Sequence, residues 1–96
     1  MTITFYKQQS GFTRYYTMHD RQGSLFSPYT FTAVWGRVLE RGREKVYTFD
    51  SRETMDKKLR ELMRKRISSG YRVLYSFSRS SEYKEIFKTA VEIKAV

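Results

Sequence analysis

The sequence contains no cysteine, which excludes disulfide staples, thiolate zinc sites and a cysteine nucleophile. It also contains a single histidine, His19, in a polar stretch that we expect to form a loop. Because one imidazole is too small a ligand set for a metal centre, we expect no metal and no cofactor.

Long apolar runs are absent as well. No stretch approaches the roughly 20 apolar residues of a transmembrane helix, and Met1 to Lys7 lacks the charged and apolar segments of a signal peptide. We therefore expect a soluble cytoplasmic protein that does not enter a membrane, and one that associates with the nucleoid if its source is a bacterium.

Catalytic patterns are equally sparse. Glu40, Glu44 and Asp50 are too scattered to suggest a carboxylate pair, and no serine has a recognisable base and orienting group. Neither a phosphate loop nor a dinucleotide fingerprint occurs. The sequence thus predicts no enzyme and no small-molecule substrate.

The charge that is present has mostly one sign. Nineteen Lys and Arg oppose ten Asp and Glu among 96 residues, giving a net charge of +9. Such an excess is the electrostatic footprint of nucleic-acid binders, although a solubilising surface, an anionic membrane or an acidic protein would also suit it. Nucleic acid is the leading partner on this ground.

The first half of the chain alternates in the period-2 manner of strands, and the length suits one domain. We expect Val38 and Leu39 to continue the third strand, with turns at Ser10-Gly11 and Arg41-Gly42. The expected strands cover residues 2–7, 12–18, 29–35 and 45–49.

A helix is predicted next, starting at a cap formed by Asp50 or Ser51 and ending at Gly70 in a left-handed conformation. Its apolar stripe comprises Met55, Leu59, Leu62, Met63 and Ile67, and five cations project from the opposite side: Lys57, Lys58, Arg60, Arg64 and Lys65. A further strand alternates through Tyr71, Val73, Tyr75 and Phe77. Residues 78–96 suit a short helix and an extended end. The fold class is therefore α+β, an antiparallel sheet with one long amphipathic helix packed on it.

The order of these features resembles the WGR domain, which is named for a Trp-Gly-Arg signature. Here Trp35-Gly36-Arg37-Val38 follows an alternating strand and precedes a glycine turn, a strand, the helix and Gly70-Tyr71. The upstream Arg14-Tyr15-Tyr16 is similar to the basic-aromatic-Tyr segment of the family. The resemblance is strongest over residues 12–77 of a single domain covering 1–96, with 78–96 as a C-terminal extension.

The resemblance implies a role at DNA breaks. In DNA-dependent poly(ADP-ribose) polymerases the signature Trp packs on the sugar or base at a strand end, and the Arg contacts phosphate or a neighbouring domain. This implies Trp35 as the stacking group, Arg37 as the phosphate or partner contact, and Arg43 or Lys45 as the basic group beyond the turn. The sequence departs from the family at Leu39, where glycine is usual. Gly11-Phe12-Thr13 also replaces the polymerases' Asn-rich approach to the second strand, which leaves recognition of a 5′-phosphorylated end without support. The chain has no room for an ADP-ribosyltransferase domain.

The same residues also allow structural roles. By alternation Trp35 shares a face with Phe31 and Ala33, so it either packs in the core or contacts DNA. The helix cations either face solvent or touch the DNA backbone. Tyr71 either packs on the helix end or makes a polar contact.

The hypothesis that follows is a non-catalytic DNA-binding module that favours ends or breaks, and the alternative is a protein-interaction adaptor using the Trp-Gly-Arg surface. Gly36 enters the candidate site because it has no side chain to obstruct a ligand. The candidate nucleic-acid-binding residues are Trp35, Gly36, Arg37, Arg43, Lys45, Lys57, Lys58, Arg60, Arg64, Lys65 and Tyr71.

Overall fold

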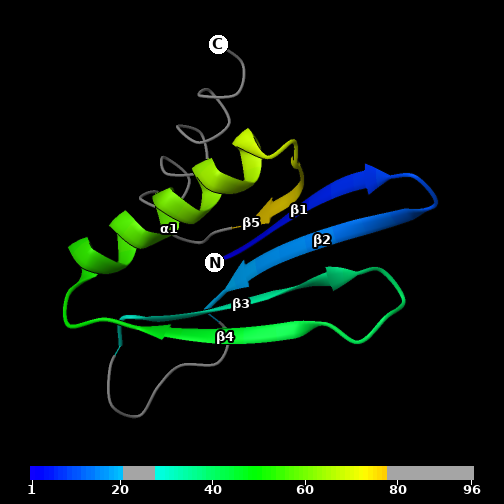
Figure 1. Ribbon diagram of the computed structural model, residues 1–96. Coiled ribbons are helices and arrows are strands. Elements are labelled where there is room, and N and C mark those ends of the chain that lie inside the picture. Colours follow the sequence, from blue (N-terminus) through cyan, green and yellow to red (C-terminus); the bar gives the residue numbers. More distant parts are fainter. Residues whose placement is uncertain (21–27, 78–96) are drawn as a thin grey trace.

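The computed structural model describes residues 1–20 and 28–77, which form a five-stranded antiparallel sheet with one helix packed on it (Figure 1). The strand order across the sheet is β4-β3-β2-β1-β5. This confirms the predicted α+β class, while the predicted helix and extended end within 78–96 lie outside the described residues. The elements are β1 (Thr2–Gln9), β2 (Phe12–His19), β3 (Thr30–Arg37), β4 (Arg43–Thr48), α1 (Arg52–Ser68) and β5 (Arg72–Phe77).

One face of the sheet, called here the helix-bearing face, forms the core together with α1. The whole predicted stripe of the helix is buried, and Leu59 and Met63 at its centre are fully enclosed. Burying a side chain of this size contributes about 1.5–3 kcal/mol. The sheet side of the core consists of Ile3, Phe5, Tyr16, Met18, Phe31 and Ala33.

Both ends of α1 are capped by their own sequence. Ser51 is the N-cap, and its hydroxyl accepts a hydrogen bond from the Thr54 amide at 3.3 Å. At the other end Gly70 has φ +94°, and the Tyr71 amide donates to the Arg66 carbonyl at 3.0 Å. This is the glycine-dependent helix stop that the sequence predicts, and it turns the chain directly into β5.

The connection between β3 and β4 differs from the prediction. Val38 and Leu39 form the turn rather than extending the strand, because β3 ends at Arg37 and β4 begins at Arg43. Leu39 has φ +72°, a left-handed conformation suited to a turn and incompatible with a strand.

Two further expectations were wrong. His19 is the last residue of β2 and is buried, whereas a loop position was expected. In β5 the alternation is interrupted by an irregularity in the pairing with β1, where Val73 lies opposite Phe5 but Tyr75 lies opposite Thr4. Val73 and Tyr75 therefore occupy opposite faces of the sheet.

Candidate nucleic-acid interface

Strand register brings the signature tryptophan into a row of large side chains on the helix-bearing face. Tyr16 lies opposite Trp35 across β2 and β3, and Trp35 lies opposite Arg43 across β3 and β4. Both hairpin turns lie at the same end of the sheet, beyond the C-terminal end of α1 (Figure 1). Trp35 thus sits towards the end of the sheet that carries these turns.

The neighbouring row, one step closer to the turns, is basic. Lys7 pairs with Arg14 and Arg14 pairs with Arg37, so three cations stand side by side on adjacent strands; they are called here the cation row. With Arg43 and Lys45 they are the charged strand residues of the helix-bearing face, and no carboxylate occurs among its strand positions in the described chain. A surface of one sign concentrates the positive potential that attracts a polyanion.

The register places charges of both signs on the opposite face of the sheet. Glu44 and Arg72 are the charged residues among its described strand positions, and threonine and tyrosine dominate the remainder. The positive charge of the strands is therefore concentrated on the helix-bearing side.

A hollow of about 340 Å³ opens beside Trp35, and it is called here the Trp35 hollow. The indole is partly buried: it packs against the core and stacks on Tyr16 with the ring centroids 6.0 Å apart. The ring is therefore neither sealed in the core nor free in solvent. The hollow is lined by Arg14, Trp35, Gly36, Arg37, Glu40, Arg41 and Arg43.

Two of the four arginines of the hollow, Arg14 and Arg37, are oriented by an aromatic ring rather than by a carboxylate. The Arg37 guanidinium carbon lies 4.0 Å from the centre of the Phe12 ring, and that of Arg14 lies 5.5 Å from it. Within the described chain none of the four arginines of the hollow forms an ion pair. The charges of Arg14 and Arg37 are consequently held in place without being neutralised.

A further arginine contacts the aromatic partner of Trp35. Arg66, near the end of α1, places its guanidinium carbon 4.1 Å from the Tyr16 ring, on which Trp35 also stacks. Burial raises the pKa of Tyr16 above its ordinary value, and the positive charge of Arg66 partly opposes this rise. Tyr16 is therefore a neutral phenol at physiological pH.

Gly36 has a packing role on the opposite face of the sheet. A side chain there would come within 3.1 Å of the Gly42 backbone, and one at Gly42 would overlap the Tyr15 hydroxyl. The two glycines let Tyr15 lie across the β3–β4 hairpin. Gly36 also lines the Trp35 hollow, and its role in admitting a ligand stays a prediction.

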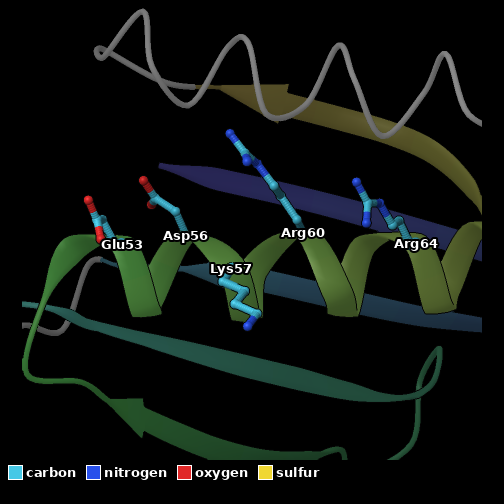
Figure 2. Close-up of a pocket in the computed structure, with 5 residues that line it drawn as sticks. All are labelled: Glu53, Asp56, Lys57, Arg60 and Arg64. Carbon is cyan, nitrogen blue, oxygen red and sulfur yellow. The ribbon is translucent and has the colours of Figure 1, made fainter.

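The five predicted helix cations do not form one surface. Lys58 faces β4, where its ammonium group and that of Lys45 lie 5.9 Å and 4.9 Å from the Tyr47 ring. Figure 2 shows Arg60 and Arg64 on the same side of α1 as Glu53 and Asp56, with Lys57 directed differently. These last five residues line a separate hollow of about 440 Å³. Lys65 is exposed near the end of the helix.

Tyr71 takes the packing role of its two predicted alternatives. It is 8% exposed and belongs to the core, and its ring lies 5.8 Å from the Arg66 guanidinium and 5.9 Å from the Lys7 ammonium. A contact with DNA stays a prediction for Tyr71, and its burial gives the ring little access to a ligand.

Several residues at the candidate interface were not among the site residues predicted from the sequence: Lys7, Phe12, Arg14, Arg41 and Arg66. The alternation places Phe12, Arg14 and Tyr16 on one face of their strand, which was a usable signal. What alternation lacks is the identity of the neighbouring strand, and only the register brings Arg14 opposite Arg37.

The described residues form neither a metal site nor a membrane-spanning helix. Residues 1–20 and 28–77 contain no group of three His, Asp or Glu side chains placed to hold a metal ion. In the same residues, no helix has the length and apolar character needed to cross a membrane.

Comparisons with known proteins agree with this architecture. The sequence profile of the WGR domain matches residues 1–78. A crystal structure of a protein from Bacteroides fragilis superposes with a TM-score of 0.64 at 17% identity, over 78% of this chain and 20% of that one. The chain thus spans about a fifth of the length of that protein, and the likeness concerns the fold. No curated protein matches the sequence significantly.

Proposed function

The chain belongs to the WGR domain family, and on that premise we propose that it is a DNA-binding module that favours strand ends and breaks. WGR domains of poly(ADP-ribose) polymerases bind nucleic acids. In this chain the supporting observation is the Trp35 hollow, which a partly exposed indole lines together with Glu40 and four arginines that form no ion pair within the described residues.

The preference for ends follows from the chemistry of stacking. An indole face stabilises a stacked nucleobase by about 1–3 kcal/mol, but bases inside a duplex already have both faces covered. A terminal or unpaired nucleotide has a free face. Guanidinium groups such as those of Arg37 and Arg43 pair bidentately with its phosphate.

The remaining cations supply binding that does not depend on the end. Contacts to phosphate fix position without reading sequence, and each one steepens the salt dependence of binding. Lys45 and Lys58 extend the interface along β4. The other helix cations are more distant: Lys57, Arg60 and Arg64 line a hollow together with Glu53 and Asp56, and Lys65 is exposed near the end of α1.

The test is a titration of fluorescently labelled duplexes that are blunt, nicked or closed by loops at both ends, followed by anisotropy over a range of salt concentrations. Trp35→Ala should weaken binding to blunt and nicked duplexes about tenfold, within the energy of one stacking contact, and should change binding to closed duplexes much less. Tyr75→Ala is the matched control, because Tyr75 is an exposed aromatic residue on the opposite face. Equal losses on all three duplexes, or no binding at low salt, would refute the proposal.

A second function is favoured by one observation. The turn beside the Trp35 hollow carries two exposed apolar residues, Val38 and the fully exposed Leu39. Tryptophan and arginine are common anchors of protein interfaces, so this rim also suits a protein partner. An adaptor would retain a co-purifying protein that Leu39→Asp loses, and its affinity for DNA would be weak and equal for all three duplexes.

A further inference from the structure

We propose that the interface binds a single-stranded extension at a DNA end, with the unpaired backbone lying on the cation row and an unpaired nucleotide stacked on Trp35. This inference rests on the proposed DNA binding and adds the form of the end that is recognised.

The cation row is a line of positive charges on which the backbone of one DNA strand can lie. Lys7, Arg14 and Arg37 occupy three adjacent strands in register. Because neighbouring strands are about 4.8 Å apart, the row spans roughly 10 Å across the sheet. Arg41, from the turn after β3, lines the Trp35 hollow beside Arg37 and adds a cation at that end.

The row is electrostatically unfavourable in the free protein. Like charges directly opposite each other on paired strands destabilise a sheet, and Arg14 and Arg37 form no ion pair within the described chain. Both guanidinium groups lie near the Phe12 ring, which orients them without removing their charge. The Lys7 ammonium donates one hydrogen bond to the Ser69 carbonyl at 2.7 Å and has two further protons to donate. A line of phosphates would neutralise all three.

The position of Trp35 distinguishes an unpaired strand from a blunt end. Trp35 is two residues from Arg37 along β3, roughly 7 Å away in an extended strand. A phosphate on the row and a base on the indole can therefore belong to the same stretch of one strand. At a blunt end the last base pair offers a face to the ring, but its backbones lead back into the duplex. An extension has a backbone that can continue across the row.

The experiment compares hairpin DNAs that share one stem and differ at the open end: blunt, with a 3′ extension of four nucleotides, or with a 5′ extension of four nucleotides. A blunt stem lengthened by two base pairs carries the same added number of nucleotides. At least one extended end should bind about tenfold more tightly than both blunt stems. Its salt dependence should be steeper by about 1.4–2.1, the value for two to three additional phosphate contacts on a single strand.

Variants locate the effect on the surface. Arg14→Ala and Arg37→Ala should each remove most of the advantage of the extended end. Arg72→Ala removes an exposed cation from the opposite face and should leave that advantage unchanged. Circular dichroism verifies that each variant is folded.

The outcomes separate this inference from the proposed function. Binding that prefers ends but treats extended and blunt stems alike would overturn the inference and leave the proposed function standing. An advantage that survives in both Arg14→Ala and Arg37→Ala would also overturn it. If the wild-type protein showed no preference for DNA ends over closed duplexes, both proposals would be refuted.

Discussion

Leu39 adopts a backbone conformation that most side chains avoid. Its φ of +72° is the only positive value outside glycine in the described chain. A left-handed conformation costs an L-residue about 1–2 kcal/mol, which replacing Leu39 by glycine would relieve. The greater chain entropy of glycine in the unfolded state offsets about 0.5–1 kcal/mol of that gain. The side chain is exposed, so no packing is lost on its removal.

We therefore expect Leu39→Gly to raise the free energy of unfolding by on the order of 0.5–1 kcal/mol. Urea denaturation monitored by circular dichroism measures the change. The neighbouring Val38→Gly has no positive φ to relieve and should lower stability. A destabilised Leu39→Gly would show that the leucine contributes contacts that outweigh its strain.

The burial of Tyr16 makes the free energy of unfolding depend on pH. Because burial raises its pKa above 10.0, the folded protein holds the phenolic proton more tightly than the unfolded chain does. This contribution to stability is complete below pH 10 and is lost as the pH rises through the folded-state pKa. From about pH 9 to about pH 11, the free energy of unfolding should fall more in the wild type than in Tyr16→Phe. Parallel curves in urea denaturation would contradict this.

Among the elements, the β3–β4 hairpin depends on the close approach of Gly36, Gly42 and Tyr15. A methyl group at Gly42 would overlap the Tyr15 hydroxyl and come within 3.0 Å of the Trp35 carbonyl oxygen. Overpacking of this kind costs about 1–3 kcal/mol, so Gly42→Ala should destabilise the domain by that amount.

Tyr15→Phe removes the overlapping oxygen and should rescue part of the loss. A double-mutant cycle by urea denaturation measures this coupling. Strictly additive effects would show that the hairpin accommodates the methyl group by moving elsewhere.

Elements whose signals are local were predicted correctly from the sequence. The apolar stripe of α1 and the stop at Gly70 depend on residues within a few positions of each other, and both are confirmed. The turn at Val38 and Leu39 was missed because a leucine in a left-handed conformation has no local signal. The irregularity in β5 arises from its pairing with β1, which alternation along one strand does not contain.

Only those candidate site residues that lie in one segment of the sequence were predictable. Trp35, Gly36 and Arg37 are consecutive, and the family resemblance identified them. Arg14 and Arg66 approach from other elements, so their place beside Trp35 and Tyr16 depends on strand order and on the docking of α1. The five helix cations were grouped by helical angle, but a helix packed on a sheet has two flanks, and these cations are divided between them.

At the scale of the whole molecule, the concentration of positive charge on the helix-bearing face favours DNA binding but lowers the stability of the fold. Arg14 stands between two cations in the row, so Arg14→Gln should raise the free energy of unfolding at low salt by a few tenths of a kcal/mol to about 1 kcal/mol. The same variant should bind DNA less tightly. Sites selected for binding often carry such a cost in stability.

Salt provides the check on this prediction. The difference between Arg14→Gln and the wild type should shrink as the ionic strength rises, because exposed charges are then screened. Arg72→Gln is the matched control, since Arg72 lies on the face where the cation row is absent. An equal gain in both variants would mean that total charge, and not the row, determines the effect.

The position of β1 between β2 and β5 has a consequence for how the chain reaches its native state. β1 can pair with β2 through a tight hairpin, whereas its other neighbour, β5, follows the helix at the far end of the described chain. Contacts between segments so far apart in sequence form late and slow the folding of a domain. Until β5 docks, one side of β1 presents unpaired backbone groups to any other extended chain, and a nascent or partly unfolded molecule is most open to aggregation along that edge.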